Sequence, residues 1–405
     1  MRKVAPYLVP LALTGLAWPL LSPSPAVGDN FQFWLAGHMV ATGHSPYDRA
    51  AWEAATGYGS TPGGVAANTV PLNLLITHAV WLYPPQTAFL FVPFGLLPFE
   101  AGVPLLHVFV LATALVGVSV AAAAVGLTGA RLAMFLALAT VSQPFVISVR
   151  NGHPIGIIVL GAALAYVGVR DRRAFTFAAG VVLLSLKPQL VIPFGIGLLV
   201  WLAIHRRWRA IAIAAVAVIA VMLPPELLNP FPFADIVSAA GDRIRADLST
   251  TAALARDLGD GVLLAAALTA TAAIACAIAV RWSRPEARPR VLFAASLLLS
   301  LVLLPYSHDY DLLLCLPAGA AALAIGAGAR RASITVLVSI AIFLVPWLLF
   351  YAWPLLGQGD RRYLGGPLGG VPLIFTYLLA LVAWSSRGET APATGASSAA
   401  AIATS

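Results

Sequence analysis

Long apolar segments separated by short polar ones make up most of this chain. A membrane-spanning helix needs about 20 predominantly apolar residues, and several of the segments approach that length. The pattern therefore predicts an all-α polytopic membrane protein with about 12 transmembrane helices. The predicted spans cover residues 4–21, 101–125, 131–149, 154–169, 174–186, 189–204, 210–228, 262–280, 291–304, 312–325, 334–351 and 372–384.

Short basic clusters between these segments give the predicted spans an orientation. Lys and Arg are enriched in cytoplasmic loops, so we expect the clusters to lie inside. The spans then pair as hairpins, and residues 22–100 lie outside because the first span exits there. Within that outer segment, prolines interrupt residues 83–99, which are too short to cross comfortably and indicate a juxtamembrane or re-entrant helix. The clusters are at residues 170–173, 205–209, 281–290, 330–331 and 387.

The N-terminus has two interpretations. Arg2 and Lys3, the apolar residues 4–21 and the small residues Ala26 and Gly28 would suit a cleaved signal peptide. We expect an uncleaved first span instead, because so many further spans follow. In both cases the residues that come next are exported.

Composition narrows the class of protein further. Hydrophobic residues make up 60% of the chain and charged ones only 10%, whereas a water-soluble domain carries about a quarter. The net charge of +8 comes from the orienting clusters, so it implies no nucleic-acid partner. Cys276 and Cys315 sit in apolar segments and predict no disulfide framework. We expect one integral membrane domain over residues 1–385 and a disordered cytoplasmic tail over residues 386–405.

The predicted topology brings the unusual polar residues to one side of the membrane. The basic clusters that set the orientation do not include these residues, so the orientation groups them independently. Polar and ionisable groups near lipid are costly and indicate a functional site by default. The outer residues are Asp29, the segment 150–153, Lys187, the segment 235–260, the segment 307–311 and the segment 360–362.

Asp29 directly follows the first apolar segment and has two interpretations that can coexist. It precedes a helix whose expected apolar face contains Phe31, Trp34, Leu35 and His38 or Met39, so it suits a helix N-cap. A carboxylate near hydrocarbon also has a raised pKa, and a general base works best close to neutral pH. An interfacial helix would fix the depth of that base.

Ser307-His308-Asp309-Tyr310-Asp311 is the densest polar motif between two apolar segments. His308 could donate to a phosphate or orient an acceptor, and we place it with Asp29 in catalysis. Asp309 and Asp311 could bind acceptor hydroxyls. An ordinary short loop is the alternative. Residue types alone would also allow a metal site, but we expect none, and no other cofactor.

Three cations on the outer side are candidate ligands for a donor phosphate. Lys187 lies midway through an apolar hairpin, where a lipid phosphate would pair with it, although snorkelling to the headgroups is an equal alternative. Arg150 lies at a predicted helix end, and Arg361 departs from the positive-inside pattern. Tyr47, in the predicted turn that starts at Ser45, is a candidate acceptor contact.

The order of these features resembles the polyprenol-phosphate-dependent transferases of glycosyltransferase family 87. The resemblance runs from Asp29 to about Pro317. One position departs from the pattern, since members commonly have Gly-Gln where this chain has Gly152-His153. The motifs that carry the resemblance are the Asp after the first span, "AGHMVATGHSPYD", "YPPQTAFLFVPFGLLPF", "RNGHPIGIIVL", "LLSLKPQL" and "YSHDYDLLLCLPA".

The resemblance implies a GT-C-type helical bundle in a bacterial plasma membrane, with its active site on the extracytoplasmic face. Members transfer mannose, or in some cases arabinofuranose, from a polyprenyl monophosphate to a glycolipid or glycan. It also implies that Asp29 is the base, and that Lys187 and His308-Asp309 contact the donor phosphate and the acceptor. We therefore expect a single inverting displacement, assisted by cations without a metal.

Other functions remain as alternatives. A transporter or lipid flippase would have a similar number of spans, but it would place its binding residues near the midplane, often in repeated halves. An O-antigen-type polymerase or ligase would be expected to have its largest outer loop late in the chain. Here the ionisable residues favour one face, and the longest outer segment follows the first span.

Overall fold

The computed structural model describes residues 12–15, 29–48, 50–52, 81, 83–234, 250–258, 261–304, 307–326, 332–355 and 368–386. Over these ranges the chain is helical and contains no strand. Several predicted features lie outside them, namely most of the first span, much of segment 235–260, the clusters at 330–331 and 387, Arg361 and the tail from residue 387 onwards. The helices are α3 Asp29–Ala41, α6 Pro85–Gly95, α7 Phe99–Ala124, α8 Gly129–Thr140, α9 Gln143–Asn151, α10 Ile155–Arg170, α11 Ala174–Leu184, η3 Pro188–Val191, α12 Ile192–Ile204, α13 Trp208–Leu228, α15 Thr251–Asp257, α16 Gly261–Trp282, α17 Arg288–Leu303, η4 Asp309–Cys315, α18 Leu316–Ile325, α19 Ala332–Leu355 and α21 Gly370–Ser385.

These helices follow the apolar segments closely, but their lengths differ. Among the described residues, α7, α13 and α16 are long and apolar enough to cross a membrane. The bent pair α8 and α9 makes a fourth candidate if it counts as one span, and several shorter apolar helices accompany them. The protein therefore has the helices of a membrane protein, while the count of about 12 spans stays a prediction.

The predicted span 131–149 is not one straight helix. It bends by 54° between α8 and α9. Pro144, in the first turn of α9, lacks the N–H that a continuous helix would need and would clash with the preceding turn. At the break, the indole N–H of Trp347 donates to the carbonyl oxygen of Val141 at 3.0 Å, which satisfies a group that the helix no longer pairs.

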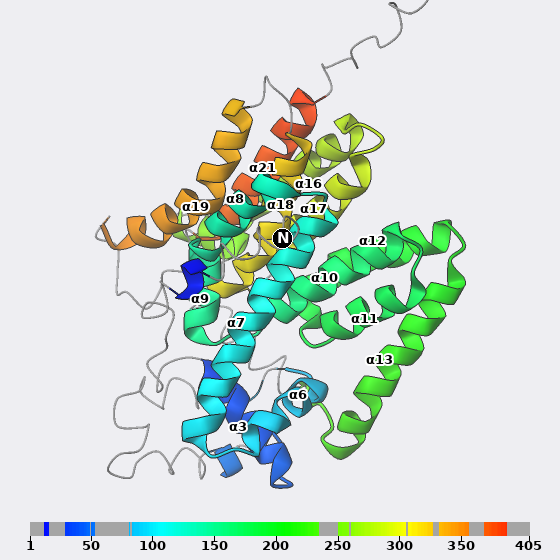
Figure 1. The fold of residues 1–405 in the computed structure, drawn as a ribbon, viewed down its shortest axis with the longest axis vertical. Coiled ribbons are helices and arrows are strands. Elements are labelled where there is room, and N and C mark those ends of the chain that lie inside the picture. Colours follow the sequence, from blue (N-terminus) through cyan, green and yellow to red (C-terminus); the bar gives the residue numbers. More distant parts are fainter. Residues whose placement is uncertain are drawn as a thin grey trace, which may run out of the picture.

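Close glycine contacts hold the central helices together. α10 packs against both α7 and α11 (Figure 1). Gly117 of α7 lies against the backbone of Gly156, and Gly156 in turn lies against the backbone of Ala114, so a Cβ atom at either glycine would collide. Small residues allow such close approach, and in lipid this packing replaces the missing hydrophobic driving force.

Three of the predicted cytoplasmic clusters lie in the described ranges, at residues 170–173, 205–209 and 281–290, and they gather at one end of this bundle. Arg170 donates to the carbonyl oxygen of Ala124 at the end of α7, and Arg207 donates to the carbonyl oxygen of Val169 at 2.7 Å. Arg290 lies beside Gly126, and Arg284 donates to the carbonyl oxygen of Ser386. These three clusters therefore share one end, while the side that this end faces stays a prediction.

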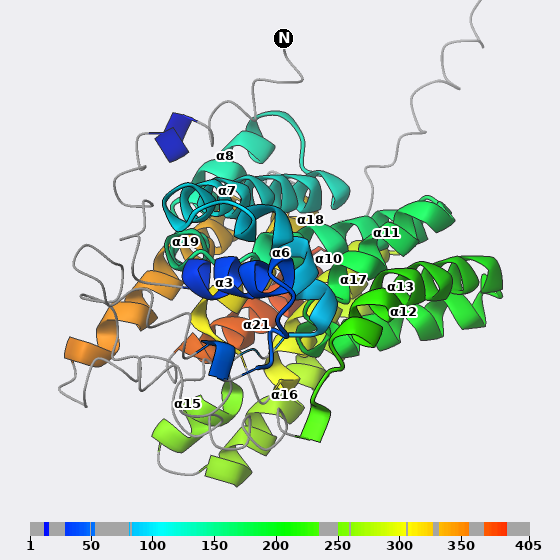
Figure 2. The same ribbon diagram turned by 90° about the horizontal axis from the view of Figure 1, so that it is seen from below.

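Helices α3 and α6 lie across the opposite end of α7 (Figures 1 and 2). Leu35 and Met39 of α3 are buried, as predicted, but Phe33 is also buried and Phe31 and Trp34 are only partly so. α3 therefore packs into a core with α6 and α7, which the expected single apolar face did not indicate. Close contact between the backbones of Gly37 and Gly95 brings α3 against α6.

Candidate functional site

Helix α6 fixes the turn that carries Lys187. Gln86 donates its side-chain N–H to the carbonyl oxygen of Ser185 at 2.9 Å, and the Thr87 hydroxyl donates to that of Leu186 at 2.8 Å. Both carbonyls lie between the end of α11 and the start of η3, where helical partners are missing. The proline-interrupted segment therefore holds the turn of Lys187 in place.

Lys187 and Asp311 form a buried ion pair. The Nζ atom lies 2.7 Å from Oδ1, and the two side chains are 3% and 0% exposed. The other carboxylate oxygen, Oδ2, accepts the backbone N–H of His308 at 2.9 Å, and the His308 side chain accepts the backbone N–H of Asp311 in return. Asp311 thus ties Lys187 to the 307–311 motif, and its predicted contact with the acceptor stays a prediction.

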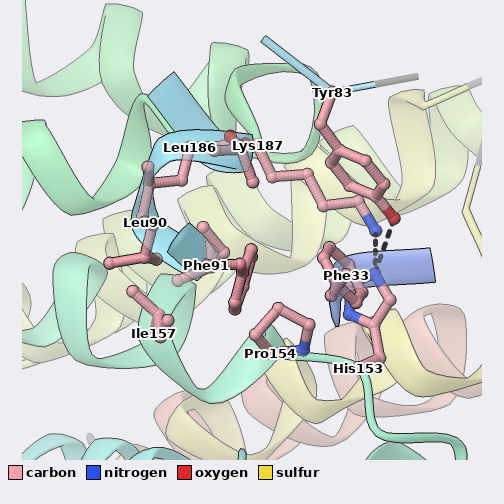
Figure 3. A pocket seen from close by; sticks show the side chains of 11 residues that line it. Phe33, Tyr83, Leu90, Phe91, His153, Pro154, Ile157, Leu186 and Lys187 are labelled. Atoms are coloured by element: carbon pink, nitrogen blue, oxygen red, sulfur yellow. Dashed lines mark hydrogen bonds between the residues drawn. The ribbon is translucent and has the colours of Figure 1, made fainter. Parts of the chain in front are cut away.

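His153 connects this ion pair to α3 and α6. It follows α9, and its Nε2 atom lies 2.8 Å from the Tyr83 hydroxyl and 3.4 Å from Lys187 Nζ (Figure 3). Its ring stacks on Tyr310 with centroids 3.9 Å apart, and it meets the ring of Phe33 edge-on at 5.3 Å. Burial, followed by the charges of Lys187 and His308, lowers the pKa of His153 well below its ordinary value. The sequence pattern does not single out His153 as a site residue, and its place beside Arg150 between two apolar segments is the one signal for it.

The first turn of α3 contacts Gly152, the residue before His153. This residue ends α9 in a left-handed conformation, with φ of 72°, and its Cα lies against the side chain of Asn30. Asn30 is itself buried and lies 3.2 Å from His107, measured between Nδ2 and Nδ1. Asp29, half-buried in that first turn, therefore lies near the Gly152-His153 turn, and the helix dipole favours its negative charge there.

We expect Gly152→Ala to lower the stability of the protein by at least about 1–3 kcal/mol, because a left-handed alanine is strained and its Cβ would overlap Asn30. Thermal unfolding in detergent would measure this. Gly195→Ala is the control, since Gly195 lies in α12 with open space around it. Equal unfolding temperatures for both variants would contradict the proposed contact.

Asp309 has a perturbed carboxyl group. It is half-buried, and its Oδ1 accepts the backbone N–H of Tyr310 at 2.9 Å. Burial, together with the charge of Asp311, raises the pKa of Asp309 to about 6, although the Tyr310 N–H partly opposes the shift. A carboxyl group that titrates near neutral pH is suited to exchanging protons or hydrogen bonds with a hydroxyl.

This shift predicts a pH dependence of stability. An unfolded aspartate has a pKa of about 4, so between about pH 4 and 6 the folded state holds the additional proton. The contribution of Asp309 is fully present below about pH 4 and is lost as pH rises through about 6. Melting curves across this range should show that Asp309→Asn removes this loss. The control variant Asp171→Asn should keep the loss of stability, because a hydrogen bond from Arg170 holds the pKa of Asp171 below its ordinary value. If the unfolding temperatures of Asp309→Asn and wild type changed with pH in parallel, the assignment to Asp309 would be contradicted.

The remaining predicted residues lie at different distances from this cluster. The Tyr47 hydroxyl donates to the carbonyl oxygen of Tyr83 at 2.7 Å, so it positions the segment that reaches His153. Burial and the charge of Glu226 raise the pKa of Tyr47. The predicted turn is present, with Asp48 N–H donating to the Ser45 carbonyl. Arg150 is exposed at the end of α9.

A small cavity lies beside Lys187 (Figure 3). Its volume of about 20 Å³ is enough for roughly one water molecule. Its polar lining residues are Tyr83, Thr87, His153 and Lys187, and its apolar ones include Phe33, Leu90 and Ile157. The described residues contain no group of three or more His, Cys, Asp or Glu side chains placed to hold a metal ion.

Comparison with known proteins identifies the family. The family model for glycosyltransferase family 87 matches residues 81–305, which is more than half of the chain. The match includes His153 and Lys187, whereas Asp29 and His308 lie outside it. Neither the curated proteins nor the solved structures give a match. The described residues form long apolar helices, and together with this family match they show that the chain is a membrane glycosyltransferase that belongs to glycosyltransferase family 87.

Proposed function

We propose that this enzyme transfers mannose from a polyprenyl-monophosphate carrier to a glycolipid or glycan at the extracytoplasmic face of a bacterial plasma membrane. The observation that carries the proposal is the buried Lys187–Asp311 pair, held among His153, Tyr310 and His308. A cation fixed in a water-poor site stabilises a leaving phosphate without having to reorganise.

Lys187 is suited to a phosphate monoester of a lipid. Among the described residues, two of its three N–H donors have acceptors, Asp311 Oδ1 and His153 Nε2. We assign the third donor to an oxygen of the donor phosphate. Because Asp311 already neutralises the lysine before substrate binds, this site suits a weakly charged leaving group better than a nucleotide diphosphate. Arg150 and Arg361 are further candidates for phosphate contacts.

The acceptor side of the proposal rests on Asp29, His308 and Asp309. The acceptor hydroxyl attacks the anomeric carbon while the bond between that carbon and the phosphate oxygen breaks. Asp29 takes the hydroxyl proton, and the electron pair of the broken bond leaves with the polyprenyl phosphate. Attack on the face opposite the leaving group inverts the anomeric configuration. Within this scheme His308 orients the reacting groups, while Asp309, Asp311 and Tyr47 bind the acceptor.

The proposed orientation rests on charge. The basic clusters share the end of the bundle away from the Lys187 region, and such clusters are typical of the cytoplasmic side. Nucleotide sugars stay in the cytoplasm, so an outer active site needs a lipid-linked donor. Membrane lipids would surround the exposed apolar faces of α12 and α13.

Sugar transfer in membranes that contain this protein would test the proposal. Labelled polyprenyl-phosphomannose would be the donor, with extracted glycolipids as acceptors and matched membranes without the protein as the control. Protein-dependent labelling of a glycolipid would support it. Labelling with polyprenyl-phosphoarabinose alone would replace mannose by arabinofuranose, and labelling with neither donor would contradict the proposed donor class.

A further inference from the structure

The contacts of His153 determine which of its nitrogens carries the proton. The ammonium group of Lys187 can only donate hydrogen bonds, and it faces Nε2 at 3.4 Å. The Tyr83 hydroxyl lies closer, at 2.8 Å from Nε2, and can donate to it as well, so we assign Nε2 as the unprotonated acceptor. A neutral imidazole carries one proton, so the proton of His153 is on Nδ1.

This Nδ1–H group is buried and has no acceptor among the described residues. The side chain is only 1% exposed. The ring cannot readily turn to find a partner, because Tyr310 stacks on it and Phe33 packs against it. Buried polar groups are nearly always hydrogen-bonded, so this group lacks a partner that a bound molecule could supply.

The neighbourhood indicates what kind of group that acceptor is. The two ring nitrogens point away from each other, so Nδ1 faces away from Lys187 and the proposed phosphate position (Figure 3). Asn30, which packs on the adjacent Gly152, has a buried Oδ1 atom with no donor among the described residues. Hydroxyl groups can accept, as Nδ1–H requires, and can also donate, as Asn30 Oδ1 requires, whereas an ionised phosphate can only accept.

We propose that Nδ1–H of His153 donates to a hydroxyl oxygen of the sugar on the polyprenyl phosphate, which makes His153 a specificity-determining residue. This inference rests on the proposed function. In this arrangement the two ring nitrogens have separate roles, because Nε2 orients Lys187 and Nδ1–H donates to the sugar. A single neutral hydrogen bond of this kind corresponds to roughly a 3- to 10-fold effect on affinity.

Binding measurements on the purified full-length protein test this without requiring turnover. Wild type and His153→Phe would be compared with polyprenyl phosphate, polyprenyl-phosphomannose and its four monodeoxy analogues. We expect one analogue to bind wild type roughly 3- to 10-fold more weakly than polyprenyl-phosphomannose does. In His153→Phe, this analogue and polyprenyl-phosphomannose should bind with equal affinity. His153→Gln is the second variant if His153→Phe does not fold, because its amide keeps an acceptor for Lys187 while displacing the donor.

The other outcomes are distinguishable. If His153→Phe bound all the glycosylated donors and bare polyprenyl phosphate more weakly than wild type by the same factor, the inference would be overturned. His153 would then only orient Lys187. Unchanged affinities in the variant would also overturn it, and would leave a bound water as the partner of Nδ1. If wild type binds polyprenyl phosphate no better than uncharged polyprenol, the proposed function itself fails.

Discussion

Replacing Asp29 by asparagine should reduce sugar transfer by roughly two to four orders of magnitude, which is the usual contribution of a general base. Asparagine keeps the size of the side chain and its ability to accept a hydrogen bond, but it cannot take the proton of the acceptor hydroxyl. The measurement is the initial rate of transfer from labelled polyprenyl-phosphomannose at matched amounts of protein in the membrane.

Asp48→Asn provides the matched control. Asp48 lies in the same N-terminal region, is exposed, and accepts the backbone N–H of Ala51 at 3.2 Å. An asparagine there retains that hydrogen bond, so transfer should stay near the wild-type rate. If Asp29→Asn retained a similar rate, Asp29 would act only at the start of α3, and His308 or Asp309 would become the candidate base.

Breaking the Lys187–Asp311 pair should have the largest effect on stability. Removing one partner of a buried ion pair leaves an uncompensated charge and costs about 3–5 kcal/mol. We therefore expect Lys187→Met and Asp311→Leu each to unfold at clearly lower temperature in detergent. Replacing both by apolar residues should recover much of the loss, since such replacements are often neutral or better.

Activity should not follow that recovery. The double variant lacks the cation proposed to stabilise the leaving phosphate, so it should fold without transferring sugar. Asp171→Asn, which removes an exposed pair with Arg170, should change neither property much. A double variant that regained transfer would show that Lys187 serves folding alone.

The sequence predicted most of the helices because the membrane imposes strong rules on composition. Predicted spans and observed helices coincide closely, as for residues 101–125 and α7 Phe99–Ala124. The bend at Pro144 and the irregular η4 were not expected, because they depend on partners distant in sequence. The indole N–H of Trp347 donates to the carbonyl oxygen of Val141 at the break before α9, and Lys187 pairs with the carboxylate of Asp311 in η4. Hydropathy carries no information on such pairings.

The sequence predicted which segments of the candidate site lie on one side, and not the contacts between them. Positive-inside reasoning placed the segments of Lys187, His153 and Asp311 on one side, and the structure brings these three side chains together. It did not indicate that Lys187 and Asp311 pair with each other, since both were assigned to substrates. His153 was missed because its importance lies in its stacking on Tyr310 and its contact with Tyr83, which only folding creates.

The Lys187–Asp311 pair also has a consequence for how the protein is made. Its partners are 124 residues apart in the chain. At about 5–20 residues per second, a ribosome needs roughly 6 to 25 s to supply Asp311 after Lys187 has been synthesised. If α11 and α12 form the predicted membrane hairpin, it enters the bilayer during that interval with an unpaired lysine at its turn. Snorkelling of the long lysine side chain towards water and headgroups would lower the cost of that unpaired charge until Asp311 is synthesised.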